Sequence, residues 1–267
     1  MNQYNGKQML NLIEVDDIDI PELHIYKQLR DNAFVQDNSF VADSPKVINL
    51  LLESDLEIKS ILSTKEYYQE FEELIRKKDI KKLYVTSKQV LQGIVGHKVH
   101  HNAMMHGIRP QPTPLEALGD QIIMLDEISF TENIGSIARS AAALGVNSYL
   151  LPKQGSHPYA RRSLRVSMGY VSKLQTHIYE DIFQTIETLK HMGYTILAAE
   201  VTDDSIDLAK LEVPKKWVLL MGHEGKGIAK EILDICDKTV KIEMVEGIKS
   251  FNVSVAASIM MYKLMHS

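Results

Sequence analysis

Three turns in the second half of the chain carry residues whose types and spacing suit ligand binding and the stabilisation of charge. They are TENIGSIARS (131–140), LLMGHEGKGI (219–228) and IEMVEGIKSFNVSVAAS (242–258). Each joins a hydrophobic, strand-like run to a turn rich in Gly, Asn or Ser, and the first and third lead directly into a helical pattern. In α/β proteins such turns lie at the carboxyl ends of strands, where ligand-binding atoms gather. We therefore expect the three turns to form a single composite site.

The second turn places its glycines at Gly222, Gly225 and Gly227, which is not the G-x-G-x-x-G order of a dinucleotide-binding fold. A tight strand-to-helix turn would explain these glycines by their backbone freedom. Alternatively, the missing side chains let backbone groups approach a ligand closely, while Glu224 supplies one fixed charge. Both explanations stay open at this point.

In the first turn, Asn133 suits a helix N-cap and Gly135 would permit close packing. Capping does not explain Arg139, which falls near the middle of a helical run of apolar and small residues. Its aliphatic stem could simply lie along the apolar surface with the guanidinium in water. Otherwise Arg139 is a fixed cation suited to a phosphate or an anionic transition state.

The third turn places Ser250, Asn252 and Ser254 at the start of the terminal helical pattern. One of them could cap the helix, but a cap needs fewer than three polar groups. The same helix carries apolar residues at core spacing, namely Val253, Ala256, Ala257, Met260 and Leu264.

Alternating strands and helices surround these turns and must position them. Such alternation predicts an α/β protein with a mainly parallel sheet covered on both faces. In the second half we expect strands at 121–128, 148–152, 194–201, 217–222 and 239–244, and helices at 134–145, 182–193, 229–237 and 252–267. In the first half we expect helices at 45–55, 66–78 and 87–96 and strands at 57–64 and 82–86.

Alternate prolines, Pro110, Pro112 and Pro114, predict a stiff, extended boundary, because proline cannot join a helix interior or a central strand. We therefore divide the chain into a first domain at 1–107, a proline-rich linker at 108–119 and a second domain at 120–267. Residues 1 to about 22 are acidic and weakly patterned, which indicates a loose lead-in.

Composition limits the class of protein. The formal net charge of -5 excludes a chain coated with positive charge but permits a local basic face. The best candidates for such a face are Arg161, Arg162, Arg165 and Lys173, which could equally form a solvated helix face. A single cysteine, Cys236, allows no intramolecular disulfide and favours a reducing compartment. No apolar run approaches the roughly 18 residues that span a bilayer, so we predict a cytoplasmic protein that does not enter a membrane.

Four histidines, His97, His100, His101 and His106, raise the question of a metal site. No cysteine accompanies them and their spacing is not that of a zinc site. We interpret the segment instead as a solvated strand edge, where the histidines and Lys98 could touch phosphate. No metal is expected.

The three turns resemble the motifs of the SpoU/TrmH family, within the SPOUT class of RNA methyltransferases. The first resembles the family's Asn-x-Gly-x-x-x-Arg motif and the second its Gly-x-Glu-Gly-x-Gly motif. The third resembles an Ile-Pro-Met strand followed by Ser-Leu-Asn-Val-Ser-Val-Ala, with Glu243 in place of the proline and Phe251 in place of the leucine. A further departure is Glu132, which stands where the family usually has proline or a small residue. RRSLRVSMG (161–169) also resembles the family's Arg-x-Ser-x-Gly segment. The likeness covers roughly residues 120–267.

This resemblance implies a C-terminal, trefoil-knotted SPOUT methyltransferase domain with a parallel sheet. A weaker likeness of the first half implies a small α/β RNA-binding domain resembling a ribosomal protein. The implied reaction moves a methyl group from S-adenosylmethionine to a ribose 2′-hydroxyl of structured RNA, ribosomal RNA in preference to transfer RNA. The implied assembly is a homodimer with the terminal helix in its interface. A non-catalytic RNA-binding protein on the same fold is the alternative.

The resemblance also implies roles for single residues. Adenine would lie among apolar side chains and backbone groups of Met221, Gly222, Ile242, Met244 and Phe251. Arg139 would bind the neighbouring phosphate and favour the alkoxide. Asn133 and Asn252 would orient the ribose and hold Arg139, with Ser250 beside them, and Glu224 would fix Arg139 by a charged hydrogen bond. Neither the modified nucleotide nor the proton acceptor is identified by these motifs.

Overall fold

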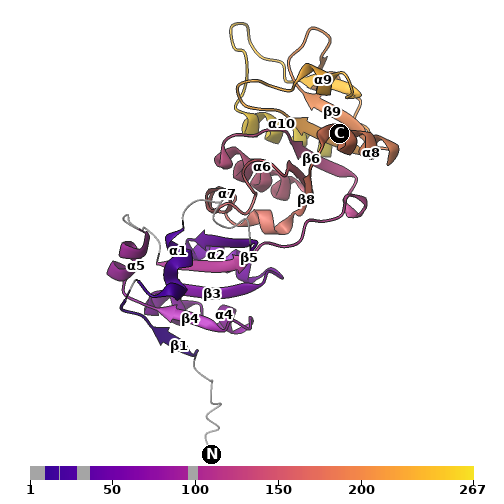
Figure 1. Ribbon diagram of the computed structural model, residues 1–267. Coiled ribbons are helices and arrows are strands. Elements are labelled where there is room, and N and C mark those ends of the chain that lie inside the picture. Colours follow the sequence, from indigo (N-terminus) through magenta and orange to yellow (C-terminus); the bar gives the residue numbers. More distant parts are fainter. Residues whose placement is uncertain (1–9, 18, 29–36, 96–101) are drawn as a thin grey trace, which may run out of the picture. The chain divides into compact units, whose positions relative to one another are not determined.

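Two sheets of different topology organise the chain, one in each of two units (Figure 1). The computed structural model describes residues 10–17, 19–28, 37–95 and 102–267. The units are Met1–Pro110 and Gln111–Ser267.

The first unit is built on a five-stranded sheet in the order β1-β4-β3-β5-β2. Strands β1, β4 and β3 are parallel, whereas β5 pairs antiparallel with both β3 and β2. The strands are β1 Leu12–Glu14, β2 Ser39–Asp43, β3 Ile58–Ser63, β4 Lys82–Val85 and β5 Ala103–Ile108. The helices are η1 Pro21–Leu23, α1 His24–Lys27, α2 Pro45–Leu52, α3 Lys65–Glu70, α4 Glu72–Arg76 and α5 Lys88–Val95.

Three expectations for this unit need correction. The predicted loose lead-in contains β1, which pairs parallel with β4, and Val15 and Leu23 are buried beyond it. The single amphipathic helix expected at 66–78 is divided at Phe71 into α3 and α4. Strand β2 was not expected and β5 was expected only as a solvated edge near His106, because short runs such as AMMHGI lack a clear period-two pattern.

His106 does not lie on a solvated strand edge. It belongs to β5, which pairs on both sides, and its Nε2 lies 2.9 Å from the Ser39 hydroxyl. Burial lowers the pKa of His106, and nearby Lys59 adds to this, while Asp37 opposes it. A half-buried histidine held in this way is a structural residue of the sheet. His97, His100 and His101 lie outside the described residues, as does Lys98.

The second unit is built on a seven-stranded sheet in which every pair is parallel, in the order β10-β12-β9-β11-β6-β7-β8. This confirms the predicted α/β class. The strands are β6 Gln121–Leu125, β7 Ser148–Pro152, β8 Gln175–Tyr179, β9 Thr195–Ala199, β10 Ile206–Asp207, β11 Trp217–Met221 and β12 Lys238–Lys241. The helices are η3 Leu115–Ala117, α6 Thr131–Leu144, α7 Arg161–Val166, η4 Tyr170–Lys173, α8 Ile182–His191, η5 Leu208–Lys210, α9 Lys230–Leu233 and α10 Val253–Met265.

Alternation along the parallel strands divides the core between the two faces of this sheet. Ile122 and Met124 of β6 pack in one buried cluster with residues of α8 and α9. Helix α10 packs on α6, which in turn packs on α7. Strand side chains alternate between faces, and helices cover both faces of the sheet. The carboxyl ends of β9, β11 and β6 lie side by side, because these three strands are neighbours in the sheet.

The predicted linker belongs largely to the second unit. Thr113 donates its backbone N–H to the carbonyl of Thr176 in β8 at 2.7 Å. Leu115 and Leu118 are buried in the core cluster of the second unit. Residues after the prolines therefore pack on the sheet, because their apolar side chains gain more from burial than an extended linker would allow.

Candidate active site

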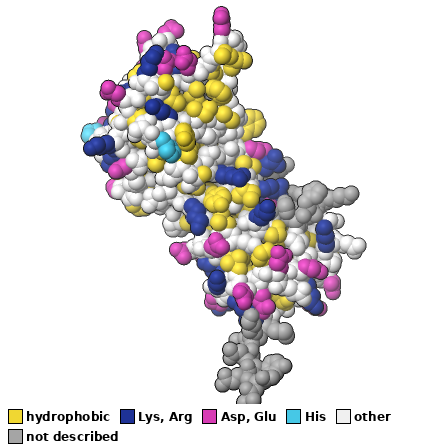
Figure 2. Space-filling model, turned by 180° about the vertical axis from the view of Figure 1, so that it is seen from behind, with side chains coloured by type: hydrophobic (Ala, Val, Ile, Leu, Met, Phe, Trp, Pro, Cys, Tyr) yellow, Lys and Arg dark blue, Asp and Glu magenta, His cyan; other side chains and the backbone are white. Residues whose placement is uncertain are grey.

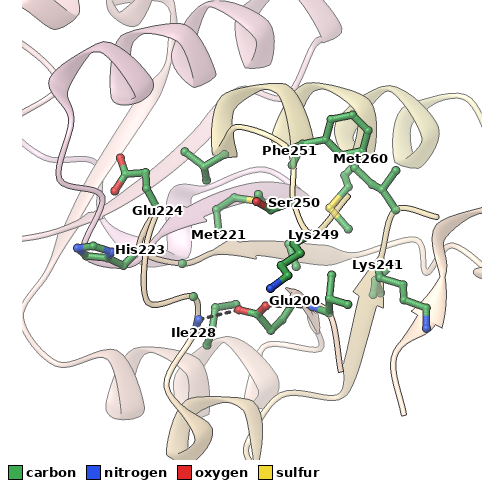
Figure 3. A pocket seen from close by; sticks show the side chains of 18 of the residues that line it. Glu200, Met221, His223, Glu224, Ile228, Lys241, Lys249, Ser250, Phe251 and Met260 are labelled. Atoms are coloured by element: carbon green, nitrogen blue, oxygen red, sulfur yellow. Dashed lines mark hydrogen bonds between the residues drawn. The ribbon is translucent and has the colours of Figure 1, made fainter. Parts of the chain in front are cut away.

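A cleft of about 430 Å³ opens at the carboxyl ends of β9, β11 and β12, beside the start of α10 (Figure 3). All five residues expected to hold the cofactor line it, together with Glu224 and Ser250, whereas Asn133, Arg139 and Asn252 do not. Apolar side chains of β11, α10 and the segment between β12 and α10 form much of its wall, namely Met221, Ile242, Met244, Phe251 and Met260.

Two glycines of the second turn are explained by close backbone packing. A Cβ on Gly222 would lie 2.5 Å from Cγ1 of Ile228 and 2.7 Å from the carbonyl carbon of Gly227. Gly227 has a φ of +68°, and a Cβ there would collide with the Glu200 carboxylate. The tight-turn explanation therefore applies to both positions. Gly225 differs, since a Cβ there would meet only the His223 ring, at 3.7 Å, and no packed neighbour requires glycine at this exposed position.

Glu200 is a cleft residue that the sequence reasoning missed. Its Oε2 accepts a 2.9 Å hydrogen bond from the backbone N–H of Ile228 (Figure 3). Its Oε1 accepts one of 3.0 Å from the backbone N–H of Val201. These bonds tie the second turn to the end of β9. The available signal was an acidic residue directly after a buried strand, at the end where α/β proteins bind ligands.

Glu224 binds the loop before α6 and the first turn of that helix, and it does not bind Arg139. Its carboxylate accepts hydrogen bonds from the backbone N–H of Ser129 at 3.0 Å and of Phe130 at 3.2 Å, and from Nδ2 of Asn133 at 2.8 Å. Burial alone would raise the pKa of Glu224, but these hydrogen bonds outweigh it and hold the pKa below its ordinary value. The carboxylate also complements the positive end of the α6 dipole.

The expected Glu224–Arg139 bond is wrong. Arg139 is exposed on α6 and makes no hydrogen bond or ion pair within the residues that the structure describes. It follows Asn133 by six residues, which moves it about 9 Å along the helix axis and onto another face. A carboxylate that serves the first turn of α6 therefore does not meet it.

His223 completes the connection between the second turn and the loop before α6. Its Nδ1 accepts hydrogen bonds from the backbone N–H groups of Gly225 at 2.9 Å and Lys226 at 3.2 Å. Its Nε2 lies 2.9 Å from the Ser129 hydroxyl. The hydrogen-bond network thus assigns the neutral tautomer with the proton on Nε2, which donates to Ser129. Sequence reasoning missed His223 because it occupies a variable position of the motif.

Asn133 and Asn252 join the first and third turns. Nδ2 of Asn252 donates to Oδ1 of Asn133 at 3.2 Å, and Oδ1 of Asn252 accepts from the backbone N–H of Ser254 at 2.9 Å and its hydroxyl at 2.7 Å. Asn252 is therefore the N-cap of α10, as capping predicted. Asn133 is not a cap, because α6 begins at Thr131 and the cap position is Phe130.

Gly135 is explained by helix packing. A Cβ at this position would lie 2.5 Å from the carbonyl oxygen of Ser163 in α7. Glycine therefore lets α7 approach α6. On the same pair of helices Nε of Arg162 lies 3.0 Å from Oε1 of Glu132. The additional carboxylate of Glu132 thus neutralises part of the basic segment, while Lys173 remains exposed in η4.

The sequence led us to expect neither a metal site nor a membrane-spanning segment. Within residues 10–17, 19–28, 37–95 and 102–267, no three His, Cys, Asp or Glu side chains are grouped to hold a metal ion. Across the same residues, every helix is too short or too polar to span a bilayer.

Comparison with known proteins assigns the fold and family. The sequence profile of the SpoU rRNA methylase family matches residues 120–262, more than half of the chain, and the chain belongs to that family. A protein of Staphylococcus haemolyticus named for the TrmH family of tRNA/rRNA methyltransferases is 33% identical over 143 residues. That match covers 54% of this chain and 57% of the other, so the chain spans little more than half the length of the curated relatives it matches.

Solved structures of the same fold cover nearly the whole chain. The AdoMet-bound rRNA methyltransferase of Sinorhizobium meliloti aligns with a TM-score of 0.82 and 21% identity, over 95% of this chain and 97% of that one. The SpoU methyltransferase AviRb of Streptomyces viridochromogenes, in complex with AdoMet, aligns with a TM-score of 0.81 and 20% identity, over 92% and 98%. These likenesses confirm the α/β fold of SPOUT methyltransferases that the motifs predict.

Proposed function

We propose that this protein transfers a methyl group from S-adenosylmethionine to a ribose 2′-hydroxyl of structured RNA, ribosomal RNA in preference to transfer RNA. The observation that carries the proposal is the cleft lined by Met221, Gly222, Ile242, Met244 and Phe251, next to the hydrogen-bonded chain of Glu224, Asn133 and Asn252. Family membership supports the reaction class, and a further structure of this fold is described as an RNA 2′-O ribose methyltransferase. We place the protein in the cytoplasm, because that is where such an RNA substrate is found.

The cleft has the size and chemistry for S-adenosylmethionine. Its volume lies within the range of small-molecule sites, and its apolar wall suits a flat adenine ring. Glu200 and Lys249 reach into the same cleft (Figure 3) and would meet the ligand's polar groups. The cofactor supplies the methyl group, and the protein's part is to orient it and exclude water. The exposed backbone of Gly225 allows the ligand to come close.

Arg139 would act on the RNA. A guanidinium stays protonated in proteins and is a poor base. We therefore propose that Arg139 binds the phosphate next to the target ribose and lowers the cost of forming the alkoxide, with the RNA phosphate or a water taking the proton. Ser250 is exposed at the cleft and available to the ribose. Asn133 already uses its Nδ2 and Oδ1 within the protein, so its role is to position α6.

A homodimer through α10 forms part of the proposal. Phe251, Val255, Ile259 and Tyr262 are spaced by three or four residues and are between 37% and 60% exposed, which places an apolar stripe on one side of this segment. Figure 2 shows apolar side chains gathered over part of the surface of the second unit. An apolar face of this kind favours burial against a partner. If a second copy completes the site, Arg139 of one copy would act at the cleft of the other, which would explain why it does not line the cleft of its own chain.

Two further features are proposed from the family. The first is the trefoil knot, supported by the path of the chain, which returns from β12 at one side of the sheet to pack α10 against α6 and β11. The second is RNA binding by the first unit, an argument by analogy alone. The alternative of a non-catalytic RNA-binding protein is kept because Arg139 lies outside the cleft.

Calorimetry with S-adenosylmethionine, followed by transfer of a labelled methyl group to RNA from a strain lacking the protein, tests the proposal. Saturable binding and labelled 2′-O-methylribose are expected. Binding without transfer would favour the passive protein, and the absence of both would remove the proposal.

A further inference from the structure

A second cavity, of about 400 Å³, lies at the carboxyl ends of β6 and β7. It is lined from β6, α6, β7, the loop after β7 and the second turn. His223 and Lys226 line both this cavity and the cleft proposed for S-adenosylmethionine. One turn of backbone therefore separates two sites on the same edge of the sheet.

The inner wall of this cavity is apolar and buried. Leu125, Ile134 and Leu151 are at most 2% exposed and belong to two neighbouring parallel strands and the helix packed on them. Glu127, at the margin, has a φ of 51°, in the left-handed region that is strained for a residue with a side chain. Strain of this kind persists where the surrounding structure holds a functional loop in place.

Four polar side chains at the rim of the cavity have no partner within the described chain, in contrast to Ser129 and His223, which bond to each other. The four are Gln154, Ser156, Lys226 and Glu127, and none of their side chains makes a hydrogen bond or ion pair within the part of the chain that the structure describes. An amide, a hydroxyl, an ammonium and a carboxylate together offer both donors and acceptors. An apolar wall edged by such groups suits a flat ring with a polar edge.

We infer that this second cavity receives an unpaired nucleobase of the RNA substrate and selects it by hydrogen bonds from Gln154 and Ser156. The inference rests on the proposed function, because it takes the neighbouring cleft to hold the methyl donor. Sequence-specific RNA recognition relies on bases turned out of the helix and hydrogen-bonded at their edges. A base in this cavity would bring its ribose to the His223–Lys226 turn, beside the cleft, and Lys226 would meet the adjoining phosphate.

Two variants of the full chain test this subsite. Gln154→Leu removes the amide while keeping the side chain's bulk, and Ser156→Phe fills the cavity. Gln184→Leu, at an exposed position of α8, makes the same chemical change away from both cavities. The readouts are calorimetric affinity for S-adenosylmethionine and steady-state methyl transfer to unmodified total RNA.

We expect Gln154→Leu and Ser156→Phe to lower kcat/KM for RNA by about tenfold or more, the equivalent of one or two hydrogen bonds. Their affinity for S-adenosylmethionine should stay within twofold of wild type, as should every property of Gln184→Leu. RNA kinetics of Gln154→Leu equal to those of Gln184→Leu would overturn the subsite while leaving the proposed function intact. A wild-type protein that neither binds the cofactor nor transfers methyl would overturn the function, and the subsite with it.

Discussion

Nδ2 of Asn133 donates a 2.8 Å hydrogen bond to Oε1 of Glu224, and this bond joins two motifs that lie 91 residues apart in the chain. Asn252 extends the same network into the third motif. The polar residues of the three motifs therefore hydrogen-bond to one another. The composite site depends on this network, because it holds the starts of α6 and α10 against the glycine turn that borders the cleft.

Asn133→Ala should lower the free energy of unfolding by about 1–2 kcal/mol, because it removes the hydrogen bonds that Asn133 makes with Glu224 and Asn252. Asn133→Asp should cost more, since it places a second carboxylate against Glu224. Urea denaturation followed by circular dichroism measures both. Arg139→Ala is the control, because that side chain is exposed and bonded to nothing in the described chain; equal stabilities of the Asn133→Ala and Arg139→Ala proteins would argue against the network.

Arg139→Ala should separate cofactor binding from transfer. We expect an affinity for S-adenosylmethionine within twofold of wild type, because Arg139 does not line the cleft. Methyl transfer should fall by about 100-fold or more, as when a charge-stabilising group is removed from an active site. Lys230→Ala, which removes one exposed positive charge on α9, controls for net charge. Near-normal methylation by the Arg139→Ala protein would remove Arg139 from the mechanism.

The lowered pKa of Glu224 predicts that the folded protein loses stability in acid. Its pKa is lower in the folded protein than in the unfolded chain, so its contribution is present above the ordinary value of 4.5 and is lost as pH falls through the folded value. The difference in unfolding free energy between wild type and Glu224→Gln should be largest above about pH 5 and shrink below pH 4. Urea titrations between pH 3 and 7 measure it, and a difference that grew on acidification would have the wrong sign.

Much of the fold could be predicted because buried parallel strands appear as continuous apolar runs. The strand at 148–152 was predicted with the bounds that β7 has. Strand β8, with the sequence QTHIY, was missed because its polar residues hide the apolar signal. Glu200 and His223 were missed because a carboxylate or imidazole that holds backbone N–H groups in a turn has no local pattern. Asn133 suited an N-cap because capping is judged from neighbours in sequence, whereas the partner of its side chain, Glu224, lies in a distant turn.

The apolar stripe formed by Phe251, Val255, Ile259 and Tyr262 predicts a dimer. Val255→Asp and Ile259→Asp together should convert a dimer into a monomer in sedimentation at micromolar concentration, because two carboxylates would be buried in the interface. Phe183→Asp changes an equally exposed apolar side chain on α8 and should leave the dimer intact. A monomeric wild-type protein under the same conditions would contradict the proposed assembly.

Ribose-methylation mapping of total RNA is the most direct test of the central claim, that the cleft and Arg139 together methylate a ribose. RNA from a strain lacking this protein should miss one 2′-O-methyl group found in its parent. The wild-type gene should restore that mark and the Arg139→Ala gene should not. An identical set of ribose methylations in the deletion strain and its parent would contradict the account.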